Sequence, residues 1–186
     1  FMDTLAHGLW AGAAAKIANG KTKKQNPFKI GWTAWWGVFP DFFAFTPLFI
    51  WLAYKLIAGD LSLGNLPRPD AYEPAGQNTL FIFNLINNLY NLSHSIFVFF
   101  LVFFSVWFIR KKPVWELLGW PLHILIDIPS HSYRFYPTPF LWPVSSWKFN
   151  GISWGTPWFM AVNYASLLLV YSSFWIKHRR QAKNKI

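Results

Sequence analysis

Two long stretches of this chain contain no charged residue, and they constrain its fold more than any other feature. They cover residues 74–109 and 149–176, and a third stretch, 30–54, carries only Asp41. Each is long enough for a helix that crosses a membrane, which needs about 20 apolar residues. Charged residues make up only 13% of the chain, against roughly 25% in soluble domains. This composition argues against a water-soluble globule and excludes intrinsic disorder.

The apolar segments predict an all-α fold, a membrane bundle of about five helices in one integral-membrane domain over residues 1–186. We expect the helices at about 3–18, 30–57, 79–109, 113–128 and 156–177. Pro113 and Pro157 suit the first turns of the last two helices. The first helix is rich in small residues, which suits close packing within one chain or between chains. These small residues are Gly8, Gly12, Ala13, Ala14 and Ala15.

Most of the 17 Lys and Arg residues fall into three blocks next to the apolar segments. They surround the first connection at 16–29, follow the third segment at 110–112, and form a basic tail at 178–186. Five alternating helices place all three blocks on one side, which the positive-inside rule makes the cytoplasm. The sequence therefore predicts a multi-pass protein of the cytoplasmic (inner) membrane with a cytoplasmic C-terminus. Nucleic acid is not an expected partner, because the basic residues are dispersed at helix ends.

Several ionisable residues lie inside the apolar segments, where a charge at the bilayer centre costs about 2.5–3.5 kcal/mol. Counted from the basic blocks at about 1.5 Å per residue, they share one layer roughly 14–24 Å from the cytoplasmic side. A common depth on four helices predicts one shared site between the helices. The residues are His7, Asp41, His94, His123 and Asp127, with His131 just after them.

His123 and Asp127 are four residues apart and therefore share one face of a helix. An imidazole nitrogen beside a carboxylate oxygen suits zinc or a similar divalent ion, and the chain has no cysteine to serve instead. Each residue also has a structural alternative without metal. These are a packed His7, a helix cap at Asp41, an interhelical hydrogen bond of His94, a metal-free His123–Asp127 pair, and a loop position for His131.

The order of these motifs resembles a known family. His7-Gly8, Pro40-Asp41, Ser93-His94-Ser95, His123-x3-Asp127 and the run 138–143 (TPFLWP) follow one another along the chain. This pattern, over residues 5 to about 145, resembles the YdjM-type family of membrane-bound metal-dependent hydrolases. That family is distantly similar to zinc-dependent phospholipase C. It often carries a second Asp and a His after Pro-Asp, where this chain has Phe42, Phe43 and Ala44.

The resemblance implies one or two divalent ions, zinc first and manganese second. Asp41, His94, His123 and Asp127 would hold one ion, and Asp127 would bridge to a second ion that His7 also holds. His131 would act as an acid near the leaving group or replace a missing ligand. Arg134, or Lys148, would steady the charge of a phosphoryl group. These residues lie in or beside the 129–155 loop, which we expect over the site.

The expected function is hydrolysis of a phosphoester, of a lipid or a headgroup, at the outer side of the membrane. A metal-activated water with a pKa near 7 would be the nucleophile, and membrane lipid would be both environment and candidate substrate. An alternative is a non-enzymatic protein that binds metal or transports ions or protons, because intramembrane His and Asp also mark such pathways. A third interpretation is that the protein is a structural or degenerate homologue of the family without activity.

Overall fold

The computed structural model describes residues 3–21, 28–62, 64, 81–133 and 136–183, and their regular structure is helical with no strand. Arg134, most of the connection 59–78 and the last three residues lie outside this part. The helices are α1 (Thr4–Lys21), α2 (Ile30–Ile57), α3 (Phe81–Ser93), α4 (Ile96–Arg110), a 3-10 helix (Trp115–Leu118), α5 (Gly119–Ser130) and α6 (Pro157–Lys183).

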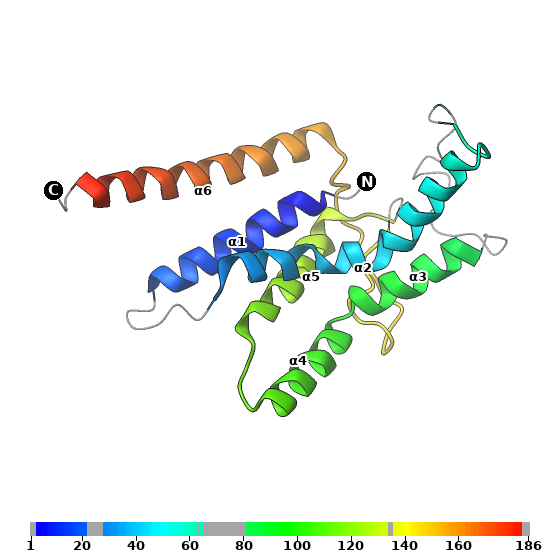
Figure 1. Cartoon of the computed structure of the whole chain (residues 1–186), viewed down its shortest axis with the longest axis horizontal. Helices are drawn as coiled ribbons and strands as arrows, with labels where there is room; N and C mark the ends of the chain where they lie inside the picture. The colour runs from blue at the N-terminus through cyan, green and yellow to red at the C-terminus, as the bar shows by residue number, and fades with distance from the viewer. Residues whose placement is uncertain (1–2, 22–27, 63, 65–80, 134–135, 184–186) are drawn as a thin grey trace.

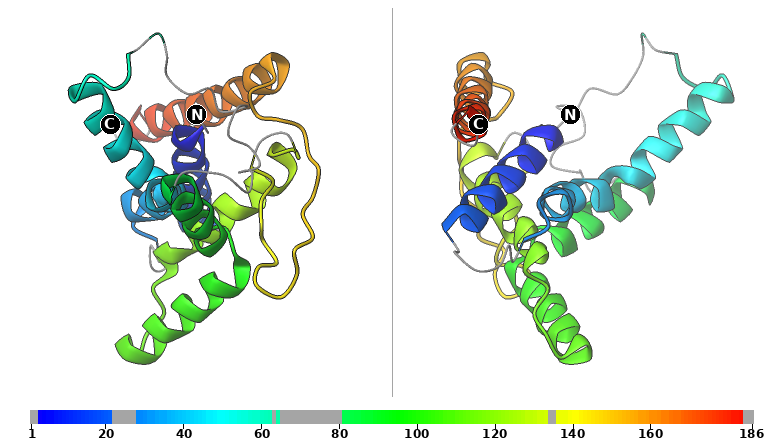
Figure 2. Two further views of the ribbon diagram at one scale, coloured as in Figure 1. Left: turned by 90° about the vertical axis from the view of Figure 1, so that its right-hand side faces the viewer. Right: turned by 60° about the vertical axis from the view of Figure 1, so that its left-hand side comes forward.

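Helix α2 is the centre of the molecule, and it packs against α1, α3 and α5. Figure 1 shows α1 beside α2 and α5 crossing them, while α6 lies along α1 on one side and α4 projects on the other (Figure 1, Figure 2). The small residues of α1 are used within the chain: Gly8 and Gly12 are buried and face α2. α2 has the predicted bounds, 30–57, with Pro40 and Pro47 inside it.

Two glycines allow the backbones at this centre to approach closely. A Cβ on Gly37 would lie 2.6 Å from Ala11 Cβ and 2.9 Å from the His7 carbonyl oxygen. A Cβ on Gly119 would lie 2.1 Å from the Thr33 carbonyl oxygen of α2. All three distances are below van der Waals contact, so only glycine fits at these two positions. This close approach holds α1, α2 and α5 around one small volume.

The prediction of one continuous helix over 79–109 is wrong. The segment breaks at His94-Ser95 into α3 and α4, which are bent by 63°. Ser95 caps α4, since its side chain accepts from Val98 N at 3.2 Å. Outside partners complete the break: Ile96 N donates to Phe140 O at 3.0 Å, and the Ser95 hydroxyl donates to Trp142 O. The loop 136–155 thus supplies acceptors that an uninterrupted helix would not need.

The last two predicted helices also have different bounds. Pro113 lies before the 3-10 helix at Trp115–Leu118, and α5 begins only at Gly119. The 12 residues of α5 rise about 18 Å, less than the roughly 30 Å of a hydrocarbon core. α6 begins at Pro157 as predicted but continues to Lys183, so residues 178–183 of the predicted tail are helical.

Two helices in the described part, α2 and α6, are long and apolar enough to cross a membrane, or three spans exist if the bent pair α3–α4 counts as one. Only 6% of the apolar stretch of α6 is buried. Such a bare apolar surface is unfavourable in water and suits contact with lipid. The five-span threading and the cytoplasmic side of the C-terminus stay predictions.

The main apolar core adjoins the helix break. It joins Phe99 and Phe103 of α4 to Trp120 and Ile124 of α5. Trp36 and Phe39 of α2 pack against the same Trp120 ring, at 6.2 and 5.2 Å between ring centroids. The Trp120 indole N–H donates to Ser93 O at the end of α3. Packing in this core therefore holds the end of α3 and the start of α4 in place. His94, which lies between these two helices, is positioned as a result.

Candidate metal centre

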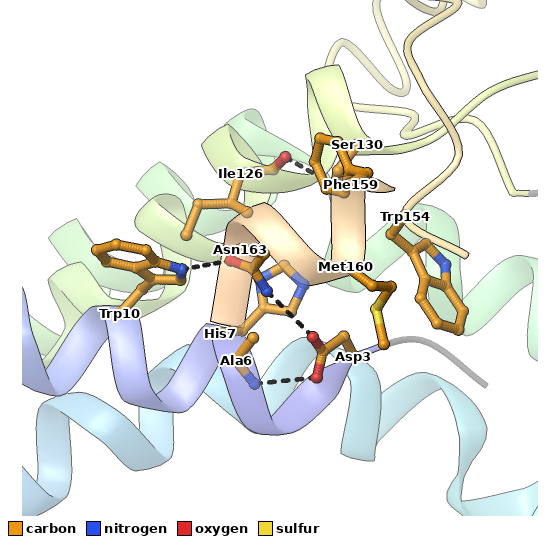
Figure 3. Close-up of a pocket in the computed structure, with 10 residues that line it drawn as sticks. All are labelled: Asp3, Ala6, His7, Trp10, Ile126, Ser130, Trp154, Phe159, Met160 and Asn163. Atoms are coloured by element: carbon orange, nitrogen blue, oxygen red, sulfur yellow. Dashed lines mark hydrogen bonds between the residues drawn. The ribbon is translucent and has the colours of Figure 1, made fainter. Parts of the chain in front are cut away.

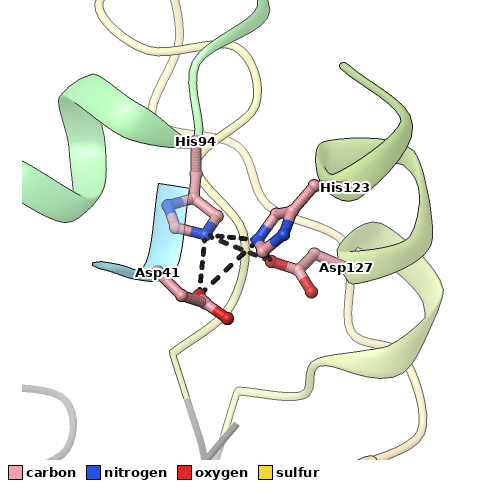
Figure 4. Close-up of side chains that lie close together, drawn as sticks. All are labelled: Asp41, His94, His123 and Asp127. Atoms are coloured by element: carbon pink, nitrogen blue, oxygen red, sulfur yellow. Dashed lines mark hydrogen bonds and ion pairs between the residues drawn. The ribbon is translucent and has the colours of Figure 1, made fainter. Parts of the chain in front are cut away.

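Four side chains from three parts of the fold converge in the interior (Figure 4). Asp41 comes from the middle of α2, His94 from the break between α3 and α4, and His123 and Asp127 from one face of α5. One ligand atom of each lies within 4.8 Å of those of the other three. All four side chains are buried, with at most 2% exposed. This is the group that the sequence predicts as the first metal site.

Three histidines direct the same nitrogen away from this group. In each, Nδ1 lies within hydrogen-bond distance of a backbone carbonyl oxygen. The pairs are His94 with Tyr90 O (3.1 Å), His123 with Gly37 O (2.7 Å) and His131 with Tyr136 O (2.8 Å). His94 Nδ1 also lies 2.9 Å from the Ser93 hydroxyl, which itself donates to Tyr90 O and so can accept from the ring. Because a carbonyl can only accept, we assign the ring proton to Nδ1, which leaves the Nε2 lone pair for the centre. Metal-binding histidines are usually held in this way.

The distances between the ligand atoms match those around one ion. His94 Nε2 lies 3.1 Å from His123 Nε2, and the two lie 3.2 and 3.1 Å from Asp127 Oδ2. Asp41 Oδ1 lies 3.6 and 3.5 Å from the same nitrogens. Four ligands at about 2.0–2.1 Å from a tetrahedral zinc ion lie roughly 3.3 Å apart. The four residues could therefore hold a metal ion, by both their chemistry and their spacing.

The buried carboxylates of Asp41 and Asp127 require a positive charge beside them, from a metal ion or from protonated histidines. Asp41 Oδ1 and both oxygens of Asp127 are buried and face histidine Nε2 atoms at 3.1–3.6 Å. Burying an unpaired carboxylate is costly, and two neutral imidazoles would direct lone pairs at them. A divalent ion satisfies all four groups at once, whereas the metal-free alternative requires protonated histidines.

Asp127 also joins the group to two further histidines. Its Oδ1 lies 3.1 Å from His7 Nε2 and 3.3 Å from His131 Nε2, while its Oδ2 faces His94 and His123. The structure thus brings the predicted ligand His7 to the other oxygen of Asp127. It places His131 beside Asp127, four residues along the chain, as a further candidate ligand. The acid role of His131 stays a prediction.

Sequence reasoning missed several residues that hold these side chains. The Thr4 hydroxyl donates to Asp41 Oδ2 at 2.7 Å, so Asp41 Oδ1 is directed at the histidines. The Tyr90 ring stacks on His94 at 3.8 Å between centroids, and its hydroxyl donates to Tyr136 O at 3.0 Å. The only signal for Thr4 was its position three residues before His7, on the same face of α1.

The loop after α5 is fastened to the end of that helix. Gly151 N donates to His131 O at 2.7 Å, and Ile152 N donates to Pro129 O at 2.9 Å. A Cβ on Gly151 would lie 2.2 Å from Pro129 O, so glycine is required there. The predicted Arg134 lies outside the described residues. Lys148 is half-buried in this loop, and burial lowers its pKa.

Comparison of the chain with protein-family models, with curated proteins and with solved structures finds no match. The fold and the buried His/Asp group therefore carry the functional argument, and the resemblance to the YdjM-type family stays a prediction.

Proposed function

We propose that this protein is a membrane-bound metal-dependent hydrolase that cleaves a phosphoester of a lipid or its headgroup. One observation carries the proposal: three histidine Nε2 atoms and two carboxylates converge, while each of those histidines is held through Nδ1 by a backbone carbonyl. Such a set of ligand atoms, buried among apolar helices, is typical of a divalent metal site.

The chain would hold the ion with Asp41, His94, His123 and Asp127. Asp127 supports a second ion in the same proposal, because its other oxygen faces His7 and His131. Thr4 keeps Asp41 in its ligand orientation. When bound, a divalent ion supplies the Lewis acidity that makes water a nucleophile near neutral pH. In hydrolysis the water oxygen forms a bond to phosphorus, a phosphorus–oxygen bond breaks, and the alcohol leaves with a proton.

A lipid phosphoester is the proposed substrate for two reasons. The exposed apolar surface of α2 and α6 suits a protein that meets its substrate in a bilayer. The motif resemblance to membrane-bound hydrolases points to the same class. Half-buried Lys148, in the loop fastened to α5, could balance phosphate charge from that side.

The test measures metal and hydrolysis on detergent-purified protein. Elemental analysis should find one or two equivalents of zinc or manganese in the wild type and a loss of at least one in Asp127→Asn. Asp60→Asn is the control, because the Asp60 side chain is 54% exposed and, among the described residues, pairs with Lys55 far from the cluster. Metal-dependent release of phosphate ester from short-chain phospholipids supports the hydrolase. Absence of stoichiometric metal after reconstitution overturns it.

The burial of the cluster favours a second candidate, a protein that binds metal or conducts ions without hydrolysis. His94 and Asp127 are 0% exposed, as in structural metal sites, whereas catalytic sites keep an open position. Metal that is bound but never accompanied by hydrolysis would favour this candidate. Metal-dependent uptake into proteoliposomes would then identify transport.

A further inference from the structure

A cavity of about 50 Å³ lies next to the cluster, between the start of α1, the end of α5 and the start of α6 (Figure 3). One water needs about 10–15 Å³, so the cavity has room for roughly three to five waters or for the end of a small polar group. His7 lines it and also contacts Asp127. The His7 side chain therefore lies between the cavity and the proposed metal site.

His7 differs from the other histidines of the cluster. Its Nε2 faces Asp127 at 3.1 Å, but its Nδ1 is buried and has no hydrogen-bond partner among the described residues. In His94, His123 and His131 a backbone carbonyl meets the corresponding Nδ1. A buried polar atom without a partner is costly. Because His7 lines the cavity, the expected partner of Nδ1 is a molecule bound there, a water or a ligand.

The chemistry of the lining narrows the identity of that molecule. Among the described residues, the Asp3 carboxylate lines the cavity and no Lys or Arg does. Binding of an anion there is therefore disfavoured. Asp3 already accepts from Asn163 Nδ2 at 3.2 Å and from the Tyr164 hydroxyl. Its negative charge is held on the cavity wall by these contacts.

A hydroxyl group satisfies His7 in either tautomer. With Nε2 used as a metal ligand, Nδ1 carries a proton and needs an acceptor. With an Nε2 proton donated to Asp127, Nδ1 needs a donor. A hydroxyl can do both, as water can, whereas an ammonium only donates and a phosphate oxygen only accepts. Trp10, Trp154 and Phe159 add apolar walls for the carbons between hydroxyl groups, which favours a polyol over water alone.

We propose that this cavity binds a neutral hydroxylated group, of the glycerol type, either as the headgroup of a phospholipid or as the free polyol. The role of that group in substrate selection rests on the proposed function, whereas its binding does not. A hydroxylated headgroup in the cavity would leave its phosphate on the side of His7 and the metal cluster.

The experiment compares dihexanoyl phosphatidylglycerol with dihexanoyl phosphatidylpropanol, which share acyl chains and net charge and differ in the two hydroxyl groups of the headgroup. Binding to detergent-solubilised, zinc-loaded protein is measured by calorimetric titration. The glycerol headgroup should bind about tenfold more tightly, because a site built for a hydroxyl rejects a group that lacks one. Equal affinity for the two lipids overturns the proposal. Competition by free glycerol assigns the site to the polyol, and its absence assigns it to the lipid headgroup.

Two further measurements locate the binding. Met160→Trp fills the cavity and should remove the preference for glycerol with the metal content unchanged, while Leu169→Trp, on the 70% exposed surface of α6, should retain it. The chain has five histidines, so ¹⁵N-histidine spectra can follow each ring. Phosphatidylglycerol should shift His7 Nδ1 and leave the Nδ1 signals of the other cluster histidines in place.

The outcomes separate this inference from the proposed function. Selective binding without hydrolysis supports the cavity assignment and overturns the hydrolase. Hydrolysis of both lipids with equal KM, unaffected by Met160→Trp, supports the hydrolase and overturns the cavity assignment. A ¹⁵N shift at another histidine, without one at His7, also overturns the cavity assignment.

Discussion

The centre of the molecule and helix α6 reverse the usual distribution of side chains in a protein. His94 and Asp127 at the centre are 0% exposed, whereas Leu168 and Leu169 of α6 are each 70% exposed. In water the leucines would be buried and the carboxylates solvated. The contrast indicates an apolar environment around the outside, with polar groups gathered where only one another, or an ion, can satisfy them.

The two regions are also stabilised by different means. The centre depends on backbone approach at glycines and on directed polar contacts. α6 is joined to α1 by a few side-chain hydrogen bonds, such as Trp10 to Asn163 at 2.8 Å and Tyr171 to Leu9 O at 2.9 Å. Substitutions at the centre should therefore cost much more than substitutions on the outer face of α6.

The largest effect is expected from a methyl group at the contact between α5 and α2. Gly119→Ala places a Cβ against Thr33 O and should lower the free energy of unfolding by about 3 kcal/mol. Gly31→Ala, which meets nothing within 4 Å, should be neutral or stabilising by about 0.5 kcal/mol. Denaturant unfolding in detergent measures both, and equal stabilities would contradict the close packing.

Metal should stabilise the centre next most strongly. An ion that binds only the folded state at about 100 times its Kd adds about 2.7 kcal/mol. Zinc should therefore raise the unfolding midpoint of the wild type, and a chelator should reverse the rise. Asp127→Asn should abolish this response. A response that survives in Asp127→Asn would place the ion elsewhere.

Two adjacent leucines on α6 test the contrast within one helix. Leu167 is 3% exposed and Leu168 is 70% exposed. Leu167→Ala should cost about 2 kcal/mol, while Leu168→Ala should stay within about 0.5 kcal/mol. Comparable losses in the two variants would mean that the outer face of α6 is covered by protein and not by lipid.

The smallest predicted effect concerns Thr4, which would act on a bound metal through Asp41. Thr4→Val removes the hydroxyl that donates to Asp41 Oδ2 and should weaken zinc binding about tenfold with the stoichiometry unchanged. Thr46→Val removes an exposed hydroxyl that donates to Phe42 O within its own helix, so zinc affinity should not change. A competition titration with a chromogenic chelator measures both affinities.

The sequence predicts the helical class, the bounds of α2 and the residues that meet at the centre. His123 and Asp127 could be placed together because helix periodicity alone puts residues four apart on one face. Asp41 and His94 required a depth argument, which works because intramembrane ionisable groups are rare. The placements hold in the structure, whereas the metal and the activity remain to be measured.

The helix break could not be predicted in the same way. Residues 79–109 are continuously apolar, and nothing local distinguishes Ser95 as a cap from a serine inside a helix. The partners at the break, Trp142 O for the Ser95 hydroxyl and Phe140 O for Ile96 N, lie more than 40 residues away in sequence. The roles of Thr4 and Gly37 also become visible only through tertiary contacts. The Thr4 hydroxyl reaches Asp41 on another helix, and the Gly37 carbonyl that orients His123 belongs to the backbone, which has no sequence signature.

The dependence of His94 on the later loop has a consequence for biosynthesis. His94 leaves the ribosome before His123 and Asp127, yet its segment is fixed by Phe140 and Trp142, which are made after both. The binding site is therefore complete only when translation has passed residue 142, although all four ligands are present once Asp127 has been made. A nascent chain that stops between these two residues carries every ligand of the four-residue group but has no finished binding site, so a metal ion bound there would report that the loop has docked.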